Sequence, residues 1–192
     1  MLGIFKEYRR KKILAQLAER PVRKGVLPNF EAVGTITFLY ALSCPGDVET
    51  LNQIDGYLKG AGIGFRGIVV ELKSSFANDS LRKEFKENLQ GRNIVFMSKN
   101  DLNWIGMPED ASFMEQESPL FISLVREPSF TMNYLTLKAN SSCIVGMYNN
   151  PKLPYTFVLE PLKTDKGEFS HTAYLESLFN YFKAFNRSVS NE

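Results

Sequence analysis

The chain of 192 residues is poor in the residues that build metal and redox sites, since it holds two Cys and one His. Cys44 and Cys143 lie far apart, outside Cys-x-x-Cys spacing, and His171 is distant from both in the sequence. We therefore expect no metal site. Each cysteine lies in or beside an apolar stretch typical of a strand, so we expect both to be buried, reduced thiols.

The sequence signatures of nucleotide binding and of ester hydrolysis are missing as well. The chain contains no Gly-x-x-x-x-Gly-Lys-Ser/Thr loop for phosphates and no Gly-x-Ser-x-Gly elbow for a nucleophilic serine. The glycines at positions 60, 62 and 64 precede a strand instead of opening a helix, so they do not form a dinucleotide-binding turn. These patterns indicate no cofactor.

Long apolar runs are also absent, because no stretch approaches the ~18 apolar residues that a membrane-spanning helix needs. Residues 1–24 are basic but lack the apolar segment of a secretory signal peptide. We therefore expect a cytoplasmic protein. An apolar share of 44% with 15 Phe and 8 Tyr is enough for the core of an ordinary globular domain.

Charge is distributed unevenly, although the net charge of the chain is only +2. Residues 1–24 carry eight Lys and Arg against two Glu, a net charge of +6, which leaves −4 for the remainder. We divide the chain accordingly into a basic N-terminal helix or arm, residues 1–24, and a single domain, residues 25–192. The arm is rich in helix-forming residues, and Pro21 ends it.

Two interpretations of the basic arm are open. In the first, Ile13, Leu14 and Leu17 pack on the body and leave a solvated basic face. In the second, the arm docks on a phosphate-rich surface, either nucleic acid or an anionic membrane. The residues that would bind such a surface are Arg9, Arg10, Lys11 and Lys12.

Strand-like and helix-like segments alternate along the body. Stretches rich in β-branched and aromatic residues predict strands at 34–42, 65–72, 94–97, 120–125, 143–148 and 155–159. Apolar residues at helical spacing predict helices between them, with Asp47 and Ser129 as N-caps, and a final helix that begins near His171. The alternation predicts an α/β fold of three layers, with a mostly parallel sheet of five or six strands in flavodoxin-like or Rossmann-like order.

No motif selects a functional site, so the topology has to select it. In an open α/β sheet, ligands bind beyond the carboxyl ends of the strands. The loop after the third strand, Asp101-Leu-Asn-Trp-Ile-Gly-Met-Pro108, is the most distinctive stretch at this edge. It holds the only tryptophan of the chain, which either fills the core beside the sheet or forms the stacking wall of a ligand pocket.

A second stretch at this edge runs from the fourth strand into a helix. In Arg126-Glu-Pro-Ser129, the free backbone N–H groups of the helix N-terminus suit an anion. The candidate ligand-binding residues of the two stretches are Asp101, Asn103, Trp104, Arg126, Ser129 and Thr131.

The loop Asp101-Leu-Asn-Trp-Ile-Gly-Met-Pro108 resembles the hallmark of an uncharacterised family of small α/β proteins from Bacteroidetes. The resemblance covers most of the chain, from about Lys6 to the last helix, and includes the segment Ser142-Cys-Ile-Val-Gly146. Met107 stands where many members are expected to have a basic residue. The resemblance implies a source and a fold with a basic N-terminal helix, and it implies no activity.

Two classes of function remain open. The first is a non-catalytic binding or housekeeping protein that holds a polar ligand or partner in a cleft at the carboxyl edge of the sheet. The second is an enzyme acting on a phosphorylated or nucleotide-like small molecule, with Asp101 as acid or base and Ser129 and Thr131 at a helix N-terminus. The lack of a recognisable nucleophile, metal set or glycine-rich loop favours the first class.

Overall fold

The fold is described from a computed structural model, which covers residues 2–19, 25, 27–29, 33–73, 76, 78–127, 129–161 and 169–189. The helices in these residues are α1 (Leu2–Ala18), α2 (Gly46–Gly60), α3 (Asp79–Asn88), α4 (Phe130–Lys138) and α5 (His171–Val189). The strands are β1 (Thr35–Leu42), β2 (Gly64–Glu71), β3 (Ile94–Met97), β4 (Phe121–Ser123), β5 (Ile144–Gly146) and β6 (Phe157–Val158). Two short 3-10 helices, η2 (Lys99–Asp101) and η3 (Ser112–Met114), lie between β3 and β4.

The six strands form one parallel sheet in the order β3-β2-β1-β4-β5-β6. The prediction of an α/β fold is thereby confirmed, and the strand order is that of the Rossmann fold. The chain builds the sheet outward from β1 to β3 and then returns to place β4 on the other side of β1. The pair β1 and β4 is therefore the switch point of the sheet, where a crevice forms at the carboxyl ends of the strands.

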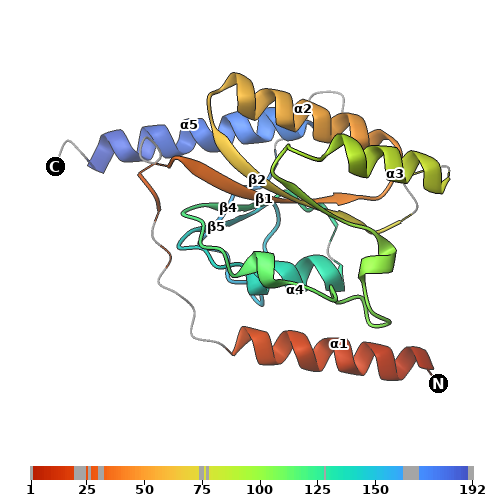
Figure 1. Cartoon of the computed structure of the whole chain (residues 1–192). Coiled ribbons are helices and arrows are strands. Elements are labelled where there is room, and N and C mark those ends of the chain that lie inside the picture. Colours follow the sequence, from red (N-terminus) through yellow and green to blue (C-terminus); the bar gives the residue numbers. More distant parts are fainter. Residues whose placement is uncertain are drawn as a thin grey trace.

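Helices cover both faces of the sheet (Figure 1). On one face, α2, α3 and α5 enclose a core with Ile36, Phe38 and Tyr40 of β1. On the other face, α4 and the segment between β3 and β4 enclose a second core with Leu39 of β1 and Ile68 of β2. Successive residues of a strand point to opposite faces, so a strand that is apolar at nearly every position can supply two cores.

The first helix, α1, lies on the outer side of α4 (Figure 1). Leu17 is buried in the second core, and Ile13 and Leu14 pack against that core. The interpretation that these three side chains pack on the body is therefore confirmed. Docking of the same helix on a phosphate-rich surface stays a prediction.

The turn into α2 differs from the prediction that Asp47 caps this helix. The N-cap residue is Pro45, and the Asp47 carboxylate instead accepts hydrogen bonds from the backbone N–H groups of Ser43 and Cys44. Proline offers no side-chain acceptor, so the carboxylate that follows it stabilises the turn from within the first helical turn. At α4 the prediction is confirmed, because the Ser129 side chain accepts from the backbone N–H of Met132.

Two charged side chains are buried in β2, one on each side of the sheet. Arg66 donates to Thr37, to the carbonyl of Phe113 and to the side chain and carbonyl of Gln116, and thereby holds the segment between β3 and β4. Glu71, fully buried at the end of β2, accepts from Nε of Arg82 at 2.8 Å and from Nη2 at 3.1 Å. Both charges are compensated by hydrogen bonds, as burial requires.

Candidate functional site

The polar residues of the loop 101–108 are engaged in shaping the loop itself. The Asp101 carboxylate accepts from the backbone N–H of Ser98 at 2.7 Å and from its hydroxyl at 2.8 Å, which closes η2 as a capping box. The Asn103 side-chain oxygen accepts from the backbone N–H groups of Ile105 and Met107, each at 3.1 Å. These bonds leave the loop in one defined conformation.

The loop lies at the carboxyl edge of the sheet, as predicted. It begins at the last residue of η2, which follows β3, and the Thr131 hydroxyl in the first turn of α4 donates to the carbonyl of Gly106 at 2.7 Å. Gly106 has a positive φ of 91°, and a Cβ at this position would lie 3.2 Å from the Thr131 hydroxyl. A glycine is therefore needed here both for the backbone conformation and for the close approach.

Trp104 does not fill the core, so that interpretation of the tryptophan is wrong. Half of its surface, 50%, is exposed, whereas the neighbouring Ile105 is buried together with Pro108 at the end of the loop. The indole stacks on Phe5 of α1, with ring centroids 6.4 Å apart and planes 5° from parallel. The guanidinium of Arg9 lies 5.8 Å from the indole and 5.0 Å from the Phe5 ring. Trp104 thus belongs to a surface that it shares with α1.

Arg10, one of the four predicted anion-binding residues, is taken up by contacts within the protein. Its Nε donates to the carbonyl of Ile105 at 2.8 Å, its Nη1 pairs with Glu7 at 2.8 Å, and its guanidinium lies 5.1 Å from the Phe130 ring. The other three, Arg9, Lys11 and Lys12, are exposed. The predicted ligand-binding residues Asp101, Asn103, Trp104 and Thr131 are brought together around this loop, whereas Arg126 lies elsewhere.

Arg126 lies at the switch point, beside a cluster that the sequence did not indicate. The cluster consists of Tyr40, Asp47 and His171, with the Tyr40 hydroxyl 3.4 Å from Asp47 and its ring 5.1 Å from the His171 ring. The Arg126 guanidinium lies 5.0 Å from the ring of Phe169. Sequence analysis places His171 correctly at the helix start, but only the tertiary structure shows that it is buried against β1.

Burial determines the protonation of this cluster. It lowers the pKa of the His171 imidazole to about 4, with a smaller contribution from the positive charge of Arg126, so the ring is neutral near pH 7. Burial also raises the pKa of the Tyr40 hydroxyl well above its usual value, and the Asp47 carboxylate adds to the shift. Among the described residues, Nε2 of His171 has no hydrogen-bond partner.

The first turn after β1 is poorly suited to a phosphate group. In sheets of this order, that turn and the helix N-terminus behind it hold phosphates on backbone N–H groups. Here the Asp47 carboxylate accepts from the backbone N–H groups of Ser43 at 2.6 Å and of Cys44 at 2.8 Å. A negative side chain therefore occupies the donors that a phosphate would use.

The two cysteines differ in environment. Cys143 is buried as predicted, and burial raises the pKa of its thiol to about 11. Cys44 is exposed, so the prediction of a buried thiol is wrong at this position. The reason is that β1 ends at Leu42 and the chain turns away from the sheet before Cys44. Both thiols are free.

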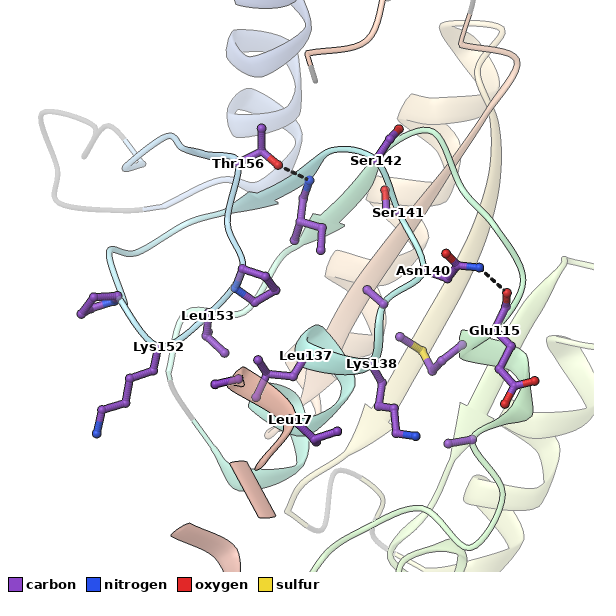
Figure 2. Close-up of a pocket in the computed structure, with 17 residues that line it drawn as sticks. Leu17, Glu115, Leu137, Lys138, Asn140, Ser141, Ser142, Lys152, Leu153 and Thr156 are labelled. Atoms are coloured by element: carbon purple, nitrogen blue, oxygen red, sulfur yellow. Dashed lines mark hydrogen bonds between the residues drawn. The ribbon is translucent and has the colours of Figure 1, made fainter. Parts of the chain in front are cut away.

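Two adjoining cavities lie on the α4 side of the sheet, between α1, α4 and the turn at 150–154. Their volumes are about 510 and 560 Å³, and both are lined by Ala18, Leu137, Lys152 and Leu153. The first extends to the C-terminal end of α4 and the start of β5, which is the amino edge of the sheet. Figure 2 shows Leu17, Leu137 and Leu153 from three elements along its wall.

The rim of these cavities carries several amino groups. Lys11 borders the second cavity, Lys138 borders the first, and Lys152 borders both. In Figure 2 the side chains of Lys138 and Lys152 extend away from the leucines. Neither Lys11 nor Lys152 forms an ion pair with any residue that the structure describes. The sequence signal was slight, since the Pro-rich stretch at 151–154 predicts only a rigid turn.

A family model for a family of unknown function (DUF6913) matches residues 6–185. The chain belongs to this family. The chain matches no curated protein and no solved structure. Membership confirms the resemblance to an uncharacterised family, whereas the restriction to Bacteroidetes and the loop hallmark stay predictions. The matched range begins within α1, so most of the basic helix lies in the region that the family shares.

Neither a metal site nor a membrane span is found in the part of the chain that the structure describes. In that part, no three His, Cys, Asp or Glu side chains are grouped so that they suit a metal ion. Among the same residues, no helix combines the length and the apolar character that crossing a membrane requires.

Proposed function

We propose that the protein is a non-catalytic binding protein whose ligand is a small anion with an apolar body. The ligand would occupy the cavities between α1, α4 and the turn at 150–154. The observation that carries this proposal is the position of Lys11 and Lys152 at the rim of an apolar cavity, without an ion-pair partner among the described residues.

The size and walls of the cavities support the apolar half of such a ligand. Volumes of about 510 and 560 Å³ fall in the range in which proteins bind small molecules. Leu14 and Leu137 line the second cavity, and Leu17 and Ile144 line the first. Burying a few methylene groups of a ligand against these side chains would contribute about 0.8 kcal/mol for each group.

The lysines support the anionic half. An ammonium group on a flexible stem can reach a carboxylate or sulfate that lies at the mouth of the cavity. Lys138, whose Nζ lies 6.0 Å from the Tyr134 ring, adds a third positive charge at the first cavity, and Glu115 is the one carboxylate among its lining residues. The balance of charge at the rim favours an anion.

Binding is favoured over catalysis because the residues suggested for an enzyme already have structural partners. Asp101 accepts from Ser98, Ser129 accepts from the first turn of α4, and Thr131 donates to Gly106. A group that caps a helix or closes a loop is held away from a substrate by those bonds.

A polar cleft at the carboxyl edge is the second candidate. It is supported by the cluster of Tyr40, Asp47 and His171 at the switch point, next to Arg126 and the exposed Cys44.

With either site, we propose that the protein is located in the cytoplasm, since an exposed free thiol such as Cys44 persists in a reducing compartment.

Calorimetric titration with decanoate tests the main proposal, with decanol as the uncharged match. We expect decanoate to bind more tightly than decanol. In Lys11→Gln and in Lys152→Gln, the Kd for decanoate should rise by about two- to fivefold, the range of an exposed ion pair, while the Kd for decanol stays unchanged. Lys86→Gln, an exposed lysine on α3, is the matched control.

A second variant tests the position of the ligand. Ala18 lines both cavities, so Ala18→Phe should fill them and abolish decanoate binding without altering the helical content seen by circular dichroism. Equal affinity for decanoate and decanol would refute the anionic part of the proposal. Unchanged binding by Ala18→Phe would place the ligand elsewhere and refute the cavity assignment.

A further inference from the structure

The most exposed large apolar side chains of the described chain gather in one place. Ile4 is 80% exposed, Tyr8 63%, Phe5 51% and Trp104 50%, and each of these values exceeds that of every other exposed large apolar residue that the structure describes. Ile4 and Tyr8 are one helical turn apart, and Phe5 stacks on Trp104. These four residues are called the α1 surface below.

Positive charge borders the α1 surface. Arg9 is exposed and lies over the rings of both Phe5 and Trp104, and Lys12 follows Tyr8 by one helical turn. Residues 2–19 together carry five Lys and Arg against two Glu, a net charge of +3. A soluble monomer seldom exposes its bulkiest apolar residues side by side, so a contiguous patch of this kind marks a binding surface.

We propose that the α1 surface docks on the anionic face of a phospholipid bilayer, with α1 lying in the plane of the membrane. Helices that bind in this way present aliphatic and aromatic side chains to the acyl boundary and Lys or Arg to the headgroups. Tryptophan and tyrosine prefer this boundary because an apolar ring and a polar N–H or O–H are both accommodated there. Arg9 and Lys12 supply the attraction to acidic headgroups.

The composition of the patch selects a bilayer over the other anionic surface, nucleic acid. Ile4, the most exposed residue of the patch, can neither hydrogen-bond a base edge nor pair with a phosphate, whereas acyl chains bury it. The stacking of Phe5 on Trp104 also covers one face of each ring that a base would need.

A second copy of the chain is a poor partner for the same surface. In a symmetric dimer the same surface patch of both copies meets, so Arg9 and Lys12 of both copies would be brought into one interface. Like charges at such short range oppose association. The proposal is also independent of the cavity ligand, because none of the four residues of the α1 surface lines either cavity.

Trp104 is the only tryptophan of the chain, so its fluorescence reports on this surface alone. The full chain is mixed with vesicles of phosphatidylcholine that contain about one third phosphatidylglycerol, and with vesicles of phosphatidylcholine only. We expect co-sedimentation and a blue shift of the Trp104 emission with the anionic vesicles, both weakened by added salt. Absence of binding, equal binding to both vesicle types, or binding without an emission change would overturn the proposal.

Paired variants test the residues. The double variant Ile4→Ser with Tyr8→Ser should lower vesicle affinity by at least about tenfold, because two exposed apolar side chains lose their burial in lipid. Leu81→Ser, which removes an exposed leucine on α3, is the matched control and should bind like the wild type. Ile4, Tyr8 and Leu81 are all exposed, so neither variant should unfold the protein.

The charge variant and a competing ligand complete the test. Arg9→Gln with Lys12→Gln should weaken co-sedimentation with anionic vesicles, because two cations that would face the acidic headgroups are removed. A single-stranded oligonucleotide is titrated in parallel. Wild-type affinity of the Ile4→Ser, Tyr8→Ser variant for anionic vesicles, or oligonucleotide binding that exceeds vesicle binding, would overturn the lipid assignment.

Discussion

Nε of Arg10 donates to the carbonyl of Ile105 at 2.8 Å, and this bond ties the first helix to the loop that carries the only tryptophan. The two residues are 95 positions apart in the sequence. The next residue of the loop, Gly106, accepts from Thr131 of α4, so the loop is bonded to two helices at once. The basic helix is thus held to the domain by a specific polar contact in addition to its leucines.

Arg10→Ala should destabilise the protein by about 1–3 kcal/mol, because the carbonyl of Ile105 loses a charged donor in a partly buried position. Urea unfolding followed by circular dichroism measures this loss. Lys12→Ala removes an exposed cation of the same helix and should change stability by less than about 0.5 kcal/mol. Equal stability of the two variants would contradict the assigned role of Arg10.

Substitution by alanine should destabilise the protein at Gly67 and stabilise it at Gly56. A Cβ at Gly67 of β2 would lie 2.7 Å from Cζ of Phe38 and 2.9 Å from Cγ1 of Ile94, so Gly67→Ala should cost about 1–3 kcal/mol. Gly56 lies within α2 with nothing within 4 Å of the added Cβ, so Gly56→Ala should stabilise by about 0.5–1 kcal/mol. Thermal unfolding of both variants tests the pair, and a shift of Tm in the same direction for both would contradict it.

His171 should make the protein less stable in acid. Its pKa is about 4 when folded and 6.5 when free, so the unfolded chain binds a proton more readily. The neutral ring therefore stabilises the fold fully above pH 6.5, and this contribution is lost as pH falls from 6.5 to 4. The loss reaches about 3 kcal/mol, at roughly 1.4 kcal/mol for each unit of pKa.

The test compares wild type with His171→Gln, which keeps a polar side chain and does not titrate. The free energy of unfolding of the wild type should fall more steeply than that of the variant between pH 6.5 and pH 4. Because the chain has one histidine, proton NMR of the imidazole gives the folded pKa directly. Parallel pH profiles of the two proteins would contradict the burial argument.

The cysteines should react with a thiol reagent at very different rates. Cys44 is exposed and should react in the native protein, whereas Cys143 is buried with its thiol pKa raised to about 11 and should react only after unfolding. Titration with a chromogenic disulfide before and after denaturation counts the two steps. Cys44→Ser should remove the native step alone, and rapid reaction of both thiols in the folded protein would contradict the assignment.

The alternation of apolar patterns along the chain was sufficient to predict the α/β class, the six strand positions and the helices. The reason is local: a strand covered on both faces must be apolar at successive positions, as in Phe38 to Leu42, and a helix must repeat its apolar residues at every turn. The cap at Ser129 and the helix start at His171 were predictable for the same reason, because they depend on a few neighbouring residues.

Only the tertiary structure shows the strand order, the exposure of Trp104 and the cavities. The pairing of β1 with β4 places Thr37 beside Phe121, and no local sequence pattern specifies which distant strand lies next to β1. Trp104 faces outward because its neighbour Ile105 takes the buried position and Phe5, far away in the sequence, supplies a stacking partner. The cavity walls come from α1, α4 and the turn at 150–154. Local propensity acts over a few residues, whereas a binding surface forms only where packing brings distant segments together.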